Sequence, residues 1–283
     1  MEPNVFIKSL HNSSRLVKQW GDQRPQNDKS LRELLSISGV SVWDVMAAEL
    51  ALYFISEKIE EGAGRKTLRQ ILTPYLRPIK YAFWRKSPVN TIDCDRWPVG
   101  STALFIGFTS YMARDVLQPV IDLMRSEDGL IPVMLTSDLV KTGDHSNQVH
   151  SINRHRGEKT VNEARKWARS IRKASLILTR QEKYRQIFVD GDRLLWPSVK
   201  HGVRRVFNVY ASHFLPDTIA VAIHILTVHR PSVIVSIDVA DPRTRVYSLL
   251  AASLGIPTVQ VQSGPVNSVR LVLFFADFKE HVT

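Results

Sequence analysis

Short apolar runs alternate with amphipathic segments through the last two thirds of the chain. The apolar runs have the length and composition of buried strands. They lie at 101–110 (STALFIGFTS), 130–138 (LIPVMLTSD), 232–237 (SVIVSI), 257–261 (PTVQV) and 270–277 (RLVLFFAD). The segments 111–129, 215–231 and 242–255 repeat their apolar positions every three or four residues, which is typical of helices that bury one face. A basic helix starting at residue 158 is expected to lead into a further strand near 175–178.

Strands that alternate with helices in this way predict parallel pairing, because each helix carries the chain back to start the next strand. We therefore expect residues 100–283 to form an α/β domain with a doubly wound, mostly parallel, Rossmann-like sheet.

The pattern before residue 100 is different. Residues 1–30 are polar and include the linker-like run GDQRPQNDKS, so we expect this segment to be flexible. Ser41, with Asp44 three residues later, predicts a capping box at the start of a long, largely buried helix. Residues 31–99 are therefore predicted to be a helical extension that precedes the sheet domain.

Polar residues follow three of the predicted strands, at the edge where parallel sheets bind their ligands. Thr109 and Ser110 follow the first strand, Asp238 follows SVIVSI, and Ser263 and Gly264 follow PTVQV. All are candidates for substrate contacts. For Thr109 and Ser110 the alternative is ordinary capping of the next helix.

Acid–base candidates group around the strand SVIVSI. Asp238 is the first candidate for a general base, with turn formation as the alternative. Asp241 is the second, although it also fits the N-cap of a helix that has Pro242 at its first position. Arg243 could hold an anionic group of a substrate. His213, just before the predicted helix at 215–231, is a third candidate base.

No motif for a cofactor or a metal ion is recognisable. Gly107 is the only glycine of a dinucleotide fingerprint after the first strand, and neither a P-loop nor a G-x-S-x-G elbow is present. Several histidines are spaced five residues apart, which matches neither a helix face nor a strand face. They are His145, His150 and His155, and then His224 and His229. We therefore predict no cofactor and no metal, and the single cysteine, Cys94, allows no disulfide within the chain.

The formal net charge of +11 favours anionic partners. The segment 65–86 interleaves basic and apolar residues and has no acid, so it could contact a membrane or polyanion, or be a solvated connector. Its basic residues are Arg65, Lys66, Arg69, Arg77, Lys80, Arg85 and Lys86. No nucleic-acid-binding motif is present, so nucleic acid is not an expected partner. Without a signal peptide or a spanning segment, we expect a cytoplasmic protein that could lie peripherally on the inner face of the membrane.

Two strand–helix–strand stretches carry a family resemblance. Residues 101–136 resemble the opening βαβ unit of a GT-B glycosyltransferase. Residues 230–264 are similar to a later unit in the same half, where a strand ending in Asp, a helix and a Gly-Ile-Pro-Thr strand ending in Gln-His-Gly recur. The upstream SISGVSVWDVMAAEL resembles the helical lead-in of bacterial surface-polysaccharide glycosyltransferases. Non-hydrolysing UDP-N-acetylglucosamine 2-epimerases share this architecture and are the nearest enzymatic alternative.

The resemblance implies transfer of a sugar from a nucleotide-sugar donor to a hydroxyl of a glycan or lipid-linked acceptor, with Asp238 as the base. One departure is that Gln-His-Gly is here Gln262-Ser263-Gly264, which replaces an imidazole by a hydroxyl. A GT-B enzyme also has two Rossmann-like halves, and we expect this chain to be the N-terminal, acceptor-side half alone. Catalysis would then need a second domain, and the remaining alternative is a non-catalytic module that binds a membrane or polyanion.

Overall fold

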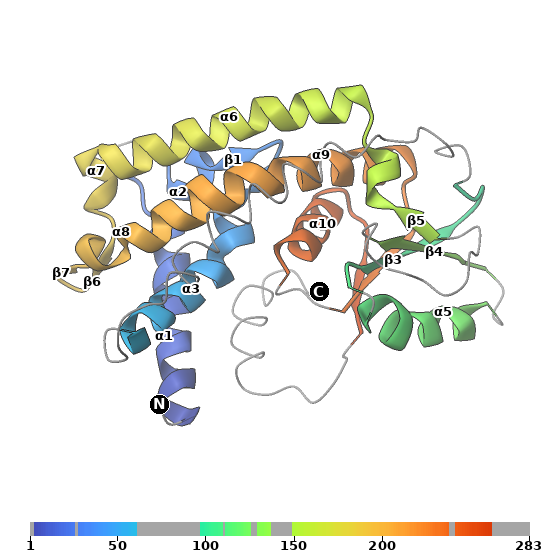
Figure 1. Cartoon of the computed structure of the whole chain (residues 1–283), viewed down its shortest axis with the longest axis horizontal. Coiled ribbons are helices and arrows are strands. Elements are labelled where there is room, and N and C mark those ends of the chain that lie inside the picture. The colour runs from blue at the N-terminus through green and yellow to red at the C-terminus, as the bar shows by residue number, and fades with distance from the viewer. Residues whose placement is uncertain are drawn as a thin grey trace. The chain divides into compact units, whose positions relative to one another are not determined.

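The computed structural model describes residues 3–25, 28–60, 97–109, 111–125, 129–136, 149–237 and 241–261. These residues form two compact units, each discontinuous in sequence (Figure 1). The first unit comprises the described residues within 1–87 and 165–216, and the second comprises those within 88–164 and 217–266. The sequence predicts one boundary near residue 100, whereas in the structure the segment 165–216 leaves the sheet domain and joins the N-terminal helices.

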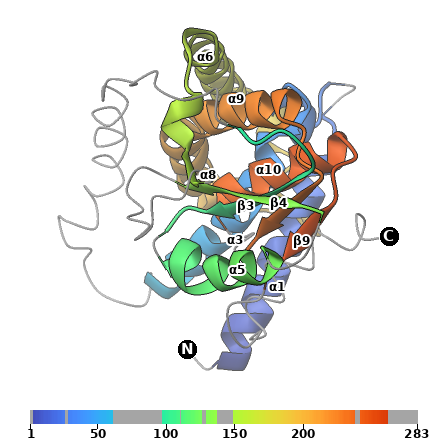
Figure 2. The ribbon, with the colours of Figure 1, turned by 90° about the vertical axis from the view of Figure 1, so that its right-hand side faces the viewer.

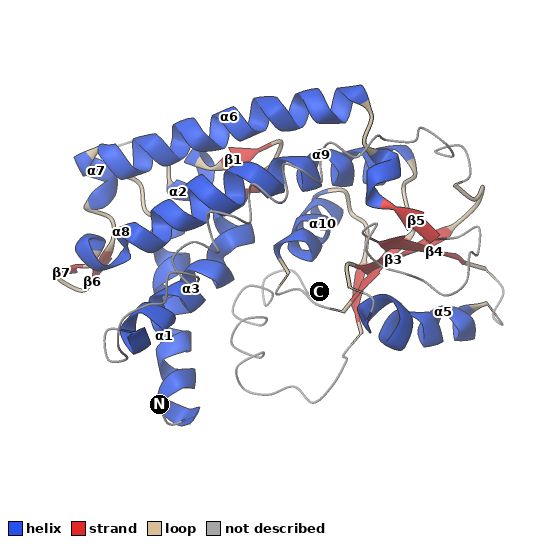
Figure 3. Ribbon diagram, viewed as in Figure 1, coloured by secondary structure: helices blue, strands red, loops and turns tan. Residues whose placement is uncertain are grey.

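The second unit is built on a five-stranded parallel sheet (Figure 3). Its strands are β3 (Thr102–Gly107), β4 (Ile131–Thr136), β5 (Val149–Ser151), β8 (Val233–Ser236) and β9 (Thr258–Gln260). Their spatial order is β5-β4-β3-β8-β9, and every neighbouring pair is parallel. Numbered along the chain, this is the order 3-2-1-4-5 of a Rossmann-like fold. The predicted doubly wound α/β class is confirmed.

Helices cover both faces of this sheet (Figure 2). A π-helical turn, η2 (Tyr111–Leu117), continues into α5 (Gln118–Met124) on one face. On the other face lie α10 (Pro242–Ser253) and the part of α9 (Ser212–Val228) that belongs to this unit. A short 3-10 turn, η3 (Ile152–His155), follows β5.

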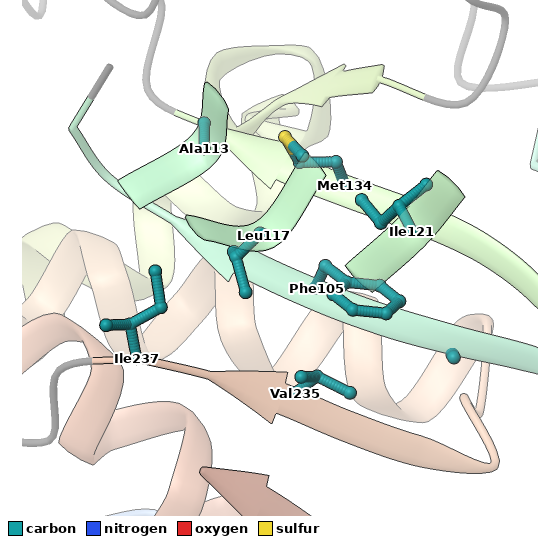
Figure 4. Close-up of a cluster of buried hydrophobic side chains, with 8 residues drawn as sticks. Phe105, Ala113, Leu117, Ile121, Met134, Val235 and Ile237 are labelled. Atoms are coloured by element: carbon teal, nitrogen blue, oxygen red, sulfur yellow. The ribbon is translucent and has the colours of Figure 1, made fainter. Parts of the chain in front are cut away.

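The core beneath α5 explains why β3 is an unbroken apolar run. All six residues of β3 are buried, because both faces of the strand are covered. Successive side chains point to opposite faces, so Phe105 faces η2 and α5 together with Met134 and Val235. These side chains gather with Leu117 and Ile121 in one cluster (Figure 4).

The first unit is mainly helical. Its helices are α1 (Pro3–Asp22), α2 (Leu31–Leu34), α3 (Val42–Glu60), α6 (Glu158–Arg180, from Arg165 onward), α7 (Glu182–Arg185), α8 (Trp196–Arg204) and the π-helical η4 (Arg205–Ala211). Two small hairpins pair β1 (Ser36–Ile37) with β2 (Val40–Ser41) and β6 (Val189–Asp190) with β7 (Arg193–Leu194). Among the described residues, no helix is both long and apolar enough to cross a bilayer.

Two sequence-based expectations were wrong. Residues 1–30 were expected to be flexible, but most of them form α1, which buries Leu10, Val17 and Trp20 on one side. The strand expected near 175–178 is the last part of α6. In both segments the buried positions recur at helical spacing, so packing overrides the polar composition of one and the β-favouring residues of the other. The strand expected at 270–277 lies outside the described residues.

Short-range hydrogen bonds mark the start of α3 and the end of α10. Asp44 N donates to Ser41 Oγ at 3.2 Å at the start of α3, and the Asp44 carboxylate accepts from Arg32 Nε at 2.7 Å. Gly255 ends α10 with φ +70°. Its amide donates to Ala252 O at 3.2 Å and the next amide donates to Ala251 O at 2.9 Å, which is a Schellman motif.

Candidate functional site

The strand order places a switch point between β3 and β8. The chain leaves β3 toward β4 on one side and leaves β8 toward β9 on the other. The segments that follow these two neighbouring strands therefore diverge, and ligands of open α/β sheets bind in the crevice between such segments. Phe108 and Thr109 follow β3, and Asp241 begins α10 after β8.

Thr109 is held by the helix that it starts. Met112 N donates to Thr109 Oγ1 at 3.2 Å, and Ala113 N donates to Thr109 O at 3.0 Å. The turn is close to the strand, because a Cβ on Gly107 would lie 3.1 Å from the Ala113 Cα. The capping role that the sequence left open for Thr109 is therefore present in the structure.

Asp241 and Arg243 form a compact ion pair at the N-terminus of α10. Asp241 Oδ1 accepts from the Arg243 backbone N at 2.8 Å, so Asp241 is the N-cap of the helix. The Arg243 side chain donates from Nε to Oδ1 at 3.0 Å and from Nη2 to Oδ2 at 2.5 Å. Both carboxylate oxygens of Asp241 are thus engaged by the residue that it caps.

The Arg243 guanidinium also bridges the two sides of the switch point. It lies over the Phe108 ring, with Cζ 4.3 Å from the ring centroid. Its side chain is 27% exposed, so it keeps access to solvent. A half-buried cation next to a helix N-terminus is a suitable contact for an anionic or strongly polar ligand group.

Buried polar groups continue from this point into α10. Tyr247 lies next to Phe108, with ring centroids 6.3 Å apart, and is completely buried. Burial raises the pKa of the Tyr247 hydroxyl, with a smaller effect from Asp217, so this group remains a proton donor at every physiological pH. Within the described part of the chain, its oxygen has no hydrogen-bond partner.

The remaining predicted site residues cannot be placed. Asp238, Ser110, Ser263 and Gly264 lie outside the described residues, as do the basic residues of 65–86. His213 belongs to α9, but its side chain is outside the described part. Of the predicted site, the structure pairs Asp241 with Arg243, and Thr109 is the chain neighbour of Phe108, which Arg243 contacts.

A second constellation, which sequence reasoning missed, lies elsewhere in the same unit. Four imidazoles and one indole form a histidine cluster: Trp97, His150, His155, His224 and His229. The Trp97 and His229 rings are stacked, with centroids 4.1 Å apart and planes inclined by 10°. His155 lies 5.8 Å from His150, 6.3 Å from His224 and 5.5 Å from His229, measured between ring centroids.

Both β5 and α9 contribute to this cluster. His150 points away from the α5 face, because its neighbour Val149 packs against that face. His150 and His155 are each 2% exposed. Burial, with smaller effects from the neighbouring imidazoles of His224 and His150, lowers the pKa of His229 from 6.5 to about 4. His229 is therefore neutral at physiological pH.

A buried ion pair follows the cluster along the chain. Arg156 Nη2 lies 3.2 Å from Asp217 Oδ1, and Arg156 Nη1 donates to Asn153 Oδ1 at 3.3 Å. The Arg156 side chain is only 7% exposed. Two histidine pairs spaced by five residues were the signal in the sequence. The spacing could not show that the two pairs lie next to each other, because one pair lies on β5 and η3 and the other lies at the end of α9.

The described residues include no group of three or more His, Cys, Asp or Glu side chains arranged to hold a metal ion. The expectation of no metal thus remains a prediction for the whole chain. No family model matches the sequence, and no curated protein and no solved structure matches it at a significant level. The function must therefore be inferred from the geometry of the second unit.

Proposed function

We propose that the second unit is the acceptor-side half of a glycosyltransferase-like protein of surface-polysaccharide synthesis. It would transfer a sugar from a nucleotide-sugar donor to a hydroxyl of a glycan or lipid-linked acceptor. The observation that carries the proposal is the Asp241–Arg243 pair on Phe108, which gathers polar and charged groups at the switch point of the parallel sheet.

The proposal gives distinct roles to the two acids. Asp238 is the second residue after β8 and is the proposed general base. Asp241 uses both carboxylate oxygens on Arg243, so its proposed role is to position this cation. Arg243 would bind an anionic or hydroxyl-rich group of the acceptor, with Thr109 at the other side of the switch point.

The chemistry balances with these groups. The acceptor hydroxyl gives its proton to the Asp238 carboxylate, and its oxygen forms a bond to the anomeric carbon of the donor. The bond from that carbon to the nucleoside diphosphate breaks, and the diphosphate leaves with the electron pair. A second Rossmann-like unit would have to hold the donor, and the described residues contain one such sheet.

Calorimetric titration with two panels of compounds tests the proposal. One panel contains nucleotide sugars, and the other contains oligosaccharides and prenyl-phosphate sugars. We expect the acceptor panel to include a ligand whose affinity falls about tenfold or more in Arg243→Gln, the loss expected for one charge-assisted hydrogen bond. The control is Arg114→Gln, which removes another arginine of the same unit that is paired with a nearby aspartate, Asp115, but is exposed.

Two results would overturn the proposal. One is that no glycan or prenyl-phosphate sugar binds. The other is that nucleotide sugars bind tightly and lose affinity in Arg243→Gln, since the switch point would then be a donor site. Inversion at C2 of a nucleotide sugar without any acceptor would instead identify the epimerase alternative.

A further inference from the structure

The exposed side of α6 carries an unusual concentration of positive charge. Within the first unit this helix runs from Arg165 to Arg180 and contains no Asp or Glu. Six of its basic residues are exposed, and we call them the α6 stripe. They are Arg165, Lys166, Arg169, Arg172, Lys173 and Arg180.

These six residues lie on one side of the helix. At 3.6 residues per turn their positions fall within an arc of about 120°, and the stripe is about 22 Å long. The opposite side of the helix is fixed by packing, because Ile171, Ala174 and Leu178 are buried. The orientation of the stripe is therefore set by the core of the unit and does not depend on the charges.

Most of this charge is not neutralised within the protein. Among the described residues, Lys166, Arg169, Arg172 and Lys173 make no ion pair. Elsewhere in the same unit basic side chains do have acidic partners: Arg32 pairs with both Asp22 and Asp44, and Lys183 pairs with Asp28. Clustered like charges repel one another, so an anionic partner would relieve a cost that the fold does not offset.

We propose that the α6 stripe binds the surface of an anionic lipid bilayer. A narrow arc of charge on a straight helix can bring every member against one flat surface at the same time. Leu176 lies within the arc and is 44% exposed. An apolar side chain flanked by long basic ones is the arrangement with which helices lie in a membrane interface, with the charged ends at the headgroups.

A nucleic acid fits this surface less well. A helix in a groove contacts phosphates on both flanks and reads bases through polar side chains at its centre. The α6 stripe has its charges on one face and Leu176 among them. The surface would bind vesicles whether or not the sheet domain binds a sugar acceptor.

Vesicle co-sedimentation of the full chain tests the proposal. We expect binding to phosphatidylcholine vesicles that contain phosphatidylglycerol, and little binding to phosphatidylcholine alone. The stripe variant Arg169→Gln/Arg172→Gln/Lys173→Gln should still form the helix, because glutamine is a good helix former. Its partition coefficient onto the anionic vesicles should fall about a hundredfold, since each charge contributes about fivefold. In Leu176→Ser the same partition coefficient should fall several-fold.

The control is Lys8→Gln/Arg193→Gln/Arg204→Gln, which removes three exposed basic residues of the same unit. Both triple variants lower the formal net charge from +11 to +8, because each replaces three cations by neutral residues (11 − 3 = 8). Equal losses in both would show that only net charge matters and would overturn the proposal. Vesicle binding that falls only in Lys80→Gln/Arg85→Gln/Lys86→Gln would also overturn the proposal. The same holds if the stripe is needed for binding to duplex DNA and the chain does not bind vesicles.

Discussion

His229→Phe should remove part of the acid sensitivity of the sheet domain. The imidazole of His229 is stacked on Trp97, and its Nε2 is buried without a hydrogen-bond partner among the described residues. A phenyl ring can keep the stacking contact and brings no polar atom of its own that would need a hydrogen bond. It also cannot be protonated. The variant therefore isolates the titration of His229 from its packing.

The magnitude follows from the shift of the His229 pKa. Burial, more than the neighbouring imidazoles, lowers this pKa from 6.5 to about 4 in the folded chain. As pH falls, the unfolded chain therefore binds the proton at His229 before the folded chain does. The contribution of neutral His229 to the free energy of unfolding is fully present above about pH 6.5 and is lost progressively toward about pH 4. Between about pH 7 and pH 5, this difference in proton binding lowers the free energy of unfolding by about 2 kcal/mol.

The assay is urea unfolding followed by circular dichroism at a series of pH values, with a chelator present. Between about pH 7 and pH 5, the free energy of unfolding of the His229→Phe variant should fall by about 2 kcal/mol less than that of the native sequence. The control His201→Phe makes the same change at an exposed position of α8, and an equal effect there would show that the change in pH dependence is not specific to His229.

An unchanged pH dependence in His229→Phe would refute the reasoning. The acid sensitivity would then belong to the other groups of this region. Those groups are His150 on β5, His155 on η3, His224 and Asp217 on α9, and Arg156. A ring resonance of His229 that titrates near pH 6.5 in the native protein would contradict the desolvation argument directly.

Three further substitutions should change the free energy of unfolding for different physical reasons. Gly202→Ala places a Cβ 2.4 Å from Tyr53 Cδ1, so we expect about 1–3 kcal/mol of destabilisation in urea unfolding, despite the better helix propensity of alanine. Gly255→Ala meets no atom within 4 Å but forces alanine to φ +70°, which should cost about 1 kcal/mol by the same assay; no loss would show that the Schellman turn relaxes. Arg156→Met leaves the Asp217 carboxylate unpaired, so we expect a loss of about 3 kcal/mol at neutral pH that Asp217→Asn in the same chain partly restores.

Four strands of the second unit's sheet, β3, β4, β8 and β9, were predictable because their signals are local, whereas β5 was not predicted. An apolar run that is buried on both faces, such as β3, can be recognised without knowing its neighbours. The same holds for α10, whose N-cap at Asp241 and Schellman glycine at Gly255 are short-range hydrogen-bond patterns. Strand order is not local and was not predicted, since the general rule for alternating strands and helices predicts only that the strands pair in parallel.

The first unit was less predictable because its core joins distant segments. Trp20 donates to Val189 O at 2.9 Å and packs on Phe188 with ring centroids 5.1 Å apart. Trp43 stacks on Phe207 at 5.4 Å. The polar composition around Trp20 gave no sign of these partners, so α1 was mistaken for a flexible segment.

The candidate site shows the same limit for individual residues. The sequence left Asp241 open between an N-cap and a catalytic acid, because an Asp before Pro fits both. The structure shows the capping geometry, with the same carboxylate holding Arg243. What the sequence could not show is that Arg243 lies on Phe108, because that contact joins the ends of two different strands. If Arg243 serves a ligand, Asp241→Asn should weaken binding by removing the charge that orients the guanidinium. That result in a ligand titration would identify Asp241 as a positioning residue, whereas unchanged binding would contradict this role.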